Sequence, residues 1–218
     1  MKKSFIIIGL GRFGFNVAKT LGIMNCDVLA IDVKEESVTA VSKFTPHCVI
    51  ADGTNLNVLR ELGAASIDHA VVAIGNNLQA SILTIVNLKN LGVKHITVRA
   101  DVEDHKELYY LIGATEVILP EESAAVSLAN QIMSDSILDY YVVADDYAMV
   151  KISVSDKFES KSLIEMNIRN AFDVNVVGII REGANFFIPR GTDKIIPGDI
   201  VVVAGKKPNI RKFDAYLN

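Results

Sequence analysis

The first two thirds of the chain alternates short apolar runs with segments in which apolar residues recur at helical spacing. The runs predict strands at 5–8, 28–31, 48–51, 70–74, 96–99 and 116–119. The segments between them predict helices near 12–24, 35–44, 55–62, 78–91, 104–112 and 121–134. Because the runs are continuous rather than alternating, we expect parallel strands that are buried on both faces. The pattern predicts an α/β fold with a doubly wound parallel sheet in the order 3-2-1-4-5-6.

The hydrophobic pattern changes near Ile137. Shorter strands are predicted at 141–143, 149–152, 174–180, 186–189 and 200–205, with turns at 145–146 and 181–185. Helices are predicted from about Ser160 and over 208–217. We therefore predict two domains, residues 1–135 and a small α+β domain at 136–218. Its unbroken Val/Ile strands are long for its size, so we expect another chain to complete or cover its sheet.

A glycine-rich turn follows the first predicted strand. Residues 9–14 have the sequence Gly-Leu-Gly-Arg-Phe-Gly, and the second predicted strand ends in Asp32. Gly9 permits a tight turn, Gly11 lets a pyrophosphate approach the backbone, and Gly14 lets the next helix pack closely on the strand. A carboxylate about 20 residues downstream accepts the ribose hydroxyls in dinucleotide-binding domains. The sequence predicts a Rossmann-like nucleotide site, and the alternative is a glycine turn that binds nothing.

The carboxyl ends of parallel strands meet at one edge of the sheet, where the ligands of such folds bind. The residues that reach this edge are predicted to line the site: Gly11, Arg12, Asp32, Lys34, Asp52, Thr54, Ala73, Ile74, Gly75, Arg99 and Glu121. Asp52 is placed near the adenine or ribose, and Thr54 is also a candidate cap for the following helix. Arginine forks suit phosphate oxygens, so Arg12 and Arg99 are predicted near the phosphates.

Glu121 stands at the same edge and has two interpretations. A carboxylate that faces phosphates is repelled unless a cation lies between them, which favours Mg²⁺ or Ca²⁺ at this position. Alternatively, Glu121 and Glu122 only bias the first turn of a helix.

The histidines do not suggest a metal or catalytic site. His47, His69 and His95 each open a predicted strand, so they belong to the edge opposite the predicted nucleotide site. In the predicted strand order, His69 and His95 are the pair expected to be close. His105 lies in a helix among acidic residues and is expected to be solvated.

Composition and charge narrow the class of protein. The 218 residues are 50% hydrophobic and 22% charged, with two cysteines and a net charge of −4, which predicts a packed core in a reduced, cytosolic setting. Apolar runs are too short for a membrane helix, and the opening residues do not resemble a signal peptide. Residues 1–135 carry 11 basic and 15 acidic residues, and residues 136–218 carry 11 of each. Neither half forms a basic surface, which argues against nucleic acid as a partner.

Enzymes of this fold form the first alternative. A small NAD-dependent oxidoreductase needs a proton-transfer residue near the nicotinamide, but residues 136–218 contain neither His nor Cys. No Ser/His/Asp set with supporting motifs occurs, and there is neither a CxxC nor an HExxH motif. The sequence therefore favours a binding protein over an enzyme.

Several stretches together carry a family resemblance. They are the glycine motif at 9–14, Ala73-Ile74-Gly75 with residues 79–81 downstream, and the run from Asp193 to Gly205. The chain resembles, over essentially its whole length, the cytosolic regulatory subunits of bacterial potassium uptake systems of the KtrA/TrkA type. In that family a Rossmann-like N-terminal RCK domain precedes a small C-terminal RCK domain.

The resemblance implies a regulator rather than an enzyme. Such proteins form homodimers that assemble into octameric rings and dock, peripheral to the membrane, on a potassium transporter subunit of the KtrB/KtrD or TrkH type. ATP activates, ADP inactivates, and related proteins bind NAD(H). The resemblance places Gly9, Gly11, Arg12, Phe13 and Gly14 at the nucleotide, with Arg12 at the γ-phosphate.

The resemblance also assigns Asp32 to the ribose and Glu121, through the Pro120-Glu121 pair, to a divalent cation. Lys34 departs from the family, in which many members have Asn at this position, so the adenine contact there is open.

The second domain of some members binds cyclic di-AMP across a two-fold interface. Ile168, Arg169, Asn175 and Pro189 are similar to that site; the alternative is an ordinary dimer contact with an exposed Arg169. A further alternative for the whole chain is a nucleotide-sensing module that serves another partner, such as an ion exchanger or a soluble enzyme.

Overall fold

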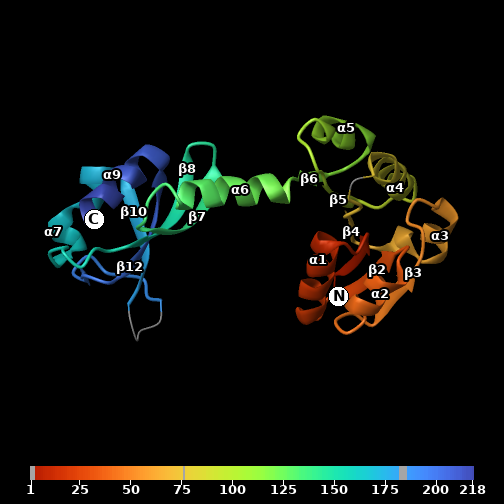
Figure 1. Ribbon diagram of the computed structural model, residues 1–218, viewed down its shortest axis with the longest axis horizontal. Helices are drawn as coiled ribbons and strands as arrows, with labels where there is room; N and C mark the ends of the chain where they lie inside the picture. The colour runs from red at the N-terminus through yellow and green to blue at the C-terminus, as the bar shows by residue number, and fades with distance from the viewer. Residues whose placement is uncertain (1–2, 76, 182–185) are drawn as a thin grey trace. The chain divides into compact units, whose positions relative to one another are not determined.

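The computed structural model describes residues 3–75, 77–181 and 186–218 and divides into two compact units, Met1–Glu121 and Glu122–Asn218 (Figure 1). The division falls within helix α6 (Pro120–Gln131), all of which the sequence prediction assigns to the first domain. Within the described residues, no helix is long and apolar enough to cross a membrane.

In the described residues of the first unit, six parallel strands form one sheet in the order β3-β2-β1-β4-β5-β6. The predicted strand order is therefore confirmed. The strands are β1 (Ser4–Ile8), β2 (Asp27–Asp32), β3 (His47–Ile50), β4 (His69–Val72), β5 (His95–Arg99) and β6 (Glu116–Ile118). In the register, Ile6 of β1 pairs with Leu29 on one side and with Ala70 on the other.

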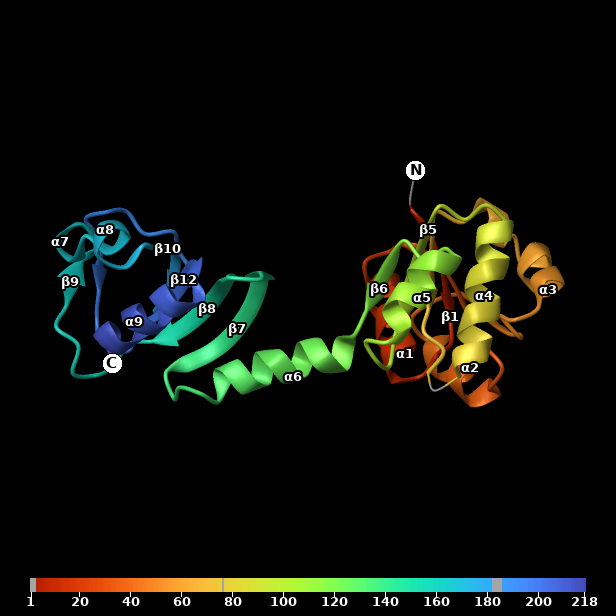
Figure 2. The same ribbon diagram turned by 90° about the horizontal axis from the view of Figure 1, so that it is seen from above.

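Helices cover both faces of this sheet. They are α1 (Arg12–Ile23), α2 (Glu35–Val41), α3 (Leu56–Glu61), the 3-10 helix η1 (Ala64–Ser66), α4 (Leu78–Asn90) and α5 (His105–Ile112). Ile7 packs in a cluster with Ala18 of α1, whereas Ile6 packs in a cluster with Ile85 of α4. Both isoleucines are fully buried, which stabilises the fold by about 1.5–3 kcal/mol for each. Figure 2 shows α4 and α5 side by side over one face.

The described residues of the second unit hold an antiparallel sheet of four strands in the order β10-β12-β8-β7. Its strands are β7 (Ile137–Ala144), β8 (Tyr147–Ser153), β10 (Val174–Ile180) and β12 (Ile200–Lys206). The other elements are β9 (Lys161–Ser162), α7 (Leu163–Met166), α8 (Ile168–Phe172), β11 (Lys194–Ile195) and α9 (Lys207–Leu217). Ile152, Val203 and Phe213 are fully buried, so α9 packs on the sheet around a separate core. The predicted α+β character of this part is confirmed.

Three details of the second unit differ from the prediction. The expected single helix near 160 is two short helices, because Asn167 adopts the left-handed conformation (φ 46°) between them. The predicted strand at 186–189 reduces to a bridge between Phe187 and Ile179. The β9–β11 ladder was not predicted, since two-residue strands leave no periodic signal. Residues 182–185 of the predicted turn lie outside the described residues.

An ion pair between a buried carboxylate and a partly exposed arginine stabilises the end of the second unit. The Asp199 carboxylate is fully buried and accepts hydrogen bonds from Arg181 Nε and Nη2 at 2.7 and 2.8 Å. The backbone N–H of Ile196 also donates to Asp199. Arg181 directly follows β10, and Ile196 and Asp199 lie in the turn before β12. The Asp199 carboxylate therefore connects this turn to the end of β10.

Helix α6 differs from the other helices because, within the described part of the chain, none of its residues is buried. Its apolar side chains Val126 and Leu128 are 41% and 56% exposed, and Ile132 just beyond it is 74% exposed. These apolar side chains are therefore left uncovered by the described residues of this chain.

Candidate nucleotide-binding site

The turn between β1 and α1 is shaped by close backbone approach. Gly9 has φ +91°, a left-handed conformation that favours glycine, and its N–H donates to Ile31 O. A Cβ on Gly14 would lie 1.9 Å from Gly9 O, so this position requires glycine. A Cβ on Gly11 would meet no described atom within 4 Å. Gly11 therefore leaves open space at the start of α1, where free N–H groups favour anions.

Asp32 holds two turns together at the end of β2. Its Oδ2 accepts a hydrogen bond from the backbone N–H of Leu10 at 2.6 Å, and its Oδ1 accepts one from the N–H of Lys34 at 2.8 Å. One carboxylate thus fixes the glycine turn against the turn that follows β2. Its remaining acceptor capacity faces the cleft, where it suits a pair of ribose hydroxyls.

Asp52 and Thr54 follow β3. The N–H and the Oγ1 of Thr54 both donate to Asp52 Oδ1, at 2.9 and 2.7 Å. The prediction that Thr54 caps the next helix is wrong. Asn55 is the cap of α3, because its side chain accepts from Asn57 N and Val58 N.

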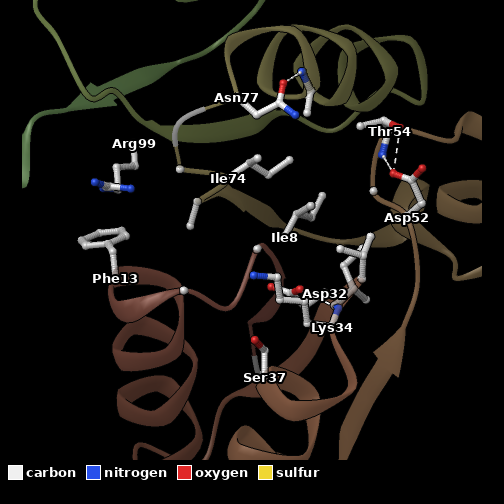
Figure 3. A pocket seen from close by; sticks show the side chains of 18 of the residues that line it. Ile8, Phe13, Asp32, Lys34, Ser37, Asp52, Thr54, Ile74, Asn77 and Arg99 are labelled. Atoms are coloured by element: carbon white, nitrogen blue, oxygen red, sulfur yellow. Dashed lines mark hydrogen bonds between the residues drawn. The ribbon is translucent and has the colours of Figure 1, made fainter.

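These turns surround a cleft of about 790 Å³ at the carboxyl ends of the strands (Figure 3). Figure 3 shows Arg99 and Phe13 at one end of the cleft, with Asp52 and Thr54 at the other. Of the residues predicted for the first domain, the structure brings these to the cleft: Gly9, Gly11, Arg12, Phe13, Asp32, Lys34, Asp52, Thr54, Ala73, Ile74, Gly75, Arg99 and Glu121. Gly14 is not among the residues that line the cleft; it supports the glycine turn through its close packing on Gly9.

Sequence reasoning missed the polar residues Ser37 and Gln79, which line the cleft, whereas it placed Asn77 at this edge in the turn Gly75-Asn76-Asn77 after the fourth strand. The side chain of Asn77 accepts from Ala80 N and caps α4. An Asn just before a helical segment is a cap signal, so the sequence contained a clue to the capping role of Asn77. The predicted turn after the fourth strand includes Asn76, which lies outside the described residues.

Charged groups of both signs meet at the end of the cleft that holds Arg99. Arg99 Nη2 lies 2.9 Å from Asp101 Oδ1 and 2.8 Å from Glu121 Oε1. The backbone N–H of Glu121 at the start of α6, followed by Arg99 and Arg12, holds the pKa of the Glu121 carboxyl below its usual value. Glu121 is therefore a charged carboxylate at neutral pH, beside the arginines that are predicted to meet phosphates.

The donor set fits a metal ion only in combination with a ligand. Within the described residues, no cluster of three or more His, Cys, Asp or Glu side chains forms a metal site. Mg²⁺ is commonly held by one or two carboxylates together with substrate phosphates and water. Glu121 fits that arrangement as the protein's ligand.

A shallow hollow of about 320 Å³ lies on the second unit and is lined in part by Ile168, Arg169 and Asn175. These predicted residues are therefore brought together by α8 and β10. Pro189, the fourth residue predicted with them, is not among the residues that line this hollow.

The opposite edge of the first sheet carries two neighbouring histidines. The rings of His69 and His95 stack with centroids 5.7 Å apart, so the prediction that these two are close is confirmed. His69 Nε2 contacts Thr97 Oγ1 at 2.8 Å, and Thr97 Oγ1 donates to Glu116. Burial, and then the neighbouring imidazole of His95, lowers the pKa of His69.

Comparisons with known proteins agree with this architecture. Residues 5–120 match the TrkA-N domain and residues 147–218 match the TrkA-C domain. The chain is 38% identical over 214 residues to the Ktr system potassium uptake protein C of Bacillus subtilis (strain 168), covering 98% of this chain and 97% of the relative. It is 36% identical over 212 residues to protein A of the same system, covering 97% and 96%.

Solved structures share the fold at low sequence identity. The GsuK RCK domain superposes with a TM-score of 0.66 at 14% identity, covering all of this chain and 48% of that one. The GsuK channel bound to NAD gives 0.68 at 15% identity, with 100% and 40% covered. The chain thus spans about half or less of these structures, and at this identity the likeness shows the fold alone.

The Rossmann-like sheet, its glycine cleft and the small antiparallel unit define a two-domain protein of the RCK class. The chain belongs to the TrkA-N/TrkA-C family, the KtrA/TrkA type of potassium uptake proteins.

Proposed function

We propose that this protein is a cytosolic regulatory subunit that gates a membrane potassium transporter in response to adenine nucleotides. The observation that carries the proposal is the cleft of about 790 Å³ in which a glycine turn, a ribose-type carboxylate and arginines line one space. A cleft of this size suits a nucleoside triphosphate or a dinucleotide. The names of the Bacillus relatives supply the link to potassium uptake.

ATP and ADP are the proposed ligands of the cleft, and NAD(H) is the competing one. Arg12 begins α1 at the glycine turn, and Arg99 stands at the same end of the cleft. A triphosphate adds charge that these arginines and a cation on Glu121 can hold, whereas a diphosphate offers less. The two nucleotides can therefore favour different conformations, within the limit set by their differential affinity.

The proposed assembly is a homodimer that builds an octameric ring on a membrane subunit. The support within this chain is the exposed apolar surface of α6, which a second copy can bury. The proposed location, at the inner face of the cell membrane, follows from the proposed partner.

Cyclic di-AMP is the proposed ligand of the second unit. Arg169 lines the hollow with Ile168 and Asn175, and a two-fold axis would bring two such arginines to a symmetric ligand with two phosphates. Pro189 stays a predicted member of this site.

The proposal is tested first by calorimetry of the full chain with ATP, ADP, NADH and cyclic di-AMP, each with and without Mg²⁺. We expect adenine nucleotides to bind in the cleft and cyclic di-AMP to bind independently of them. Arg12→Ala should weaken ATP binding more than ADP binding, whereas Arg60→Ala, on the outer helix α3, serves as the matched control. Binding of NADH alone, with hydride transfer to a substrate, would support the oxidoreductase instead.

Gating is tested by potassium flux through the reconstituted transporter. ATP activation should be reduced by Arg12→Ala and by Glu121→Gln. Unchanged activation in both variants would contradict the roles proposed for these residues.

A further inference from the structure

Arg99 is shared between two carboxylates at the phosphate end of the cleft. Its Nη2 lies 2.9 Å from Asp101 and 2.8 Å from Glu121. The Arg99 side chain is only 17% exposed, whereas that of Glu121 is 65% exposed. Arg99 is therefore the fixed member of the pair, and Glu121 is the member that is free to move toward solvent.

The surroundings of Arg99 leave part of its guanidinium unused. Its Nη1 packs so closely on Gly75 that a Cβ there would lie 2.9 Å away. Its Nε is buried and finds no hydrogen-bond partner among the described residues. Buried donors are nearly always paired in folded proteins. An unpaired one that belongs to a residue of the cleft wall points to a ligand with acceptor oxygens.

In this arrangement, the Arg99 guanidinium and a divalent metal ion compete for the Glu121 carboxylate. The oxygen that accepts from Arg99 is on the carboxylate that the proposed function assigns to Mg²⁺ or Ca²⁺. A divalent ion and a guanidinium cannot hold one exposed carboxylate in the same geometry, because both compete for the same lone pairs and repel each other.

We propose that Arg99 is a latch on Glu121. The ion pair holds the carboxylate until a ligand arrives, and a divalent cation must draw Glu121 away from Arg99 to bind it. The released guanidinium, still bound to Asp101, then donates to phosphate oxygens of the nucleotide. The inference rests on the proposed nucleotide cleft and deepens it, because it couples cation binding to the number of phosphate oxygens that reach Arg99.

The latch also links ligand binding in the cleft to helix α6 through the single residue Glu121. Glu121 is the second residue of α6 and the last residue of the first unit. Exchange of its partner from arginine to metal therefore changes the contacts of the first turn of that helix.

The test is calorimetric titration of the full chain with CaCl₂, without nucleotide and with saturating ADP or ATP. In the wild-type protein, Ca²⁺ must break the Arg99–Glu121 ion pair before it can bind Glu121. In Arg99→Met this ion pair is absent. We expect Arg99→Met to raise Ca²⁺ affinity at saturating ADP roughly two- to fivefold, the range of a partly exposed ion pair. Arg60→Met removes the same charge outside the cleft and should leave Ca²⁺ affinity unchanged.

A double-mutant cycle separates the latch from a general charge effect. In a Glu121→Gln background, Arg99→Met should no longer alter Ca²⁺ binding. Arg12→Met removes a second arginine near Glu121, whereas the hydrogen bond to the Glu121 carboxylate comes from Arg99. The effect of Arg12→Met should therefore be smaller than that of Arg99→Met.

Equal Ca²⁺ affinity in wild type and Arg99→Met, with adenine nucleotides still bound, would overturn the latch and leave the proposed function standing. Absence of adenine nucleotide binding to wild type would overturn the proposed function itself. If Arg99→Met does not fold, as judged by circular dichroism, Arg99→Gln replaces it. A glutamine carries no charge to hold Glu121, so Ca²⁺ affinity should still rise, and an unchanged value would again overturn the latch.

Discussion

At the residue scale, the charged and titratable side chains act in pairs that the fold creates from distant parts of the sequence. Arg99 meets Glu121 across 22 positions, Arg181 meets Asp199 across 18, and His69 meets Thr97 across 28. Each pair is set by neighbouring strands or by a turn beside a strand. The chemistry of each member therefore depends on its partner rather than on its residue type alone.

His69 gives a prediction about stability and pH. Burial and His95 lower its pKa in the folded state, so the unfolded chain binds the proton more tightly. Its contribution to the free energy of unfolding is complete above the unfolded pKa of about 6.5 and is lost as the pH falls below that value. We expect His69→Gln to reduce the loss of stability between pH 7 and pH 5, measured by urea unfolding.

The control for that experiment is His105→Gln, because His105 lies in α5 away from the His69–His95 stack. It should retain the pH dependence of wild type. Identical pH profiles for His69→Gln and wild type would show that His69 does not couple to folding.

At the scale of elements, two glycines near the turn between β1 and α1 have different roles: Gly14 permits close packing, and Gly11 leaves open space. Gly14 permits packing, because a Cβ there would lie 1.9 Å from Gly9 O, whereas a Cβ on Gly11 meets no described atom within 4 Å. Gly11 also has an ordinary φ of −61°. The same glycine-to-alanine change is therefore expected to have opposite consequences at the two positions.

We expect Gly14→Ala to lower the free energy of unfolding by about 1–3 kcal/mol, as overpacking does. Gly11→Ala should keep wild-type stability but weaken ATP binding at least tenfold, because its methyl group fills the space proposed for phosphate. Thermal unfolding and calorimetry measure the two effects. Full ATP affinity in a folded Gly11→Ala protein would move the phosphates away from this turn.

Helix α6 gives a second prediction at this scale. A helix of about 12 residues without tertiary contacts is marginal in water, and none of its residues is buried within the described chain. We expect Leu128→Ser to dissociate the assembled protein, measured by analytical ultracentrifugation, with little change in the unfolding of either unit. Ser123→Ala on the same helix is the control, and an unchanged assembly in Leu128→Ser would exclude this surface from the interface.

The sequence predicted the elements whose signals are local. Continuous Val/Ile runs predicted the parallel sheet and its order, and the spacing from the glycine turn to Asp32 predicted one wall of the cleft. It did not predict the β9–β11 ladder or the break at Asn167, because both depend on tertiary contacts. Nor did it predict that Arg99 would hold Glu121, since strand order brings residues to an edge without fixing which side chains pair.

At the scale of the whole molecule, each compact unit contains its own buried cluster, one around Ile6 and Ile85 and the other around Ile152 and Phe213. Separate cores are expected to respond separately to ligands and substitutions. A perturbation of one unit should therefore shift one unfolding transition.

We expect ATP at 100 times its dissociation constant to stabilise the first unit by about 2.7 kcal/mol. Asp199→Ala should destabilise the second unit by about 2–4 kcal/mol, because it removes the buried partner of Arg181. Differential scanning calorimetry should show each change in a different transition. Asp156→Ala, an exposed carboxylate, is the control, and a single transition that responds to both changes would contradict independent cores.

The bonds of Asp32 to Leu10 and Lys34 hold the floor of the cleft in place without a ligand. Because binding need not order that floor, little affinity is lost there. The contribution of the floor to the binding free energy should therefore be nearly the same for different nucleotides. Discrimination between ligands then belongs to the opposite end, where Glu121 is exposed and can exchange its partner. Under the proposed function, the ribose end of the cleft is therefore fixed and the end near Glu121 is adjustable.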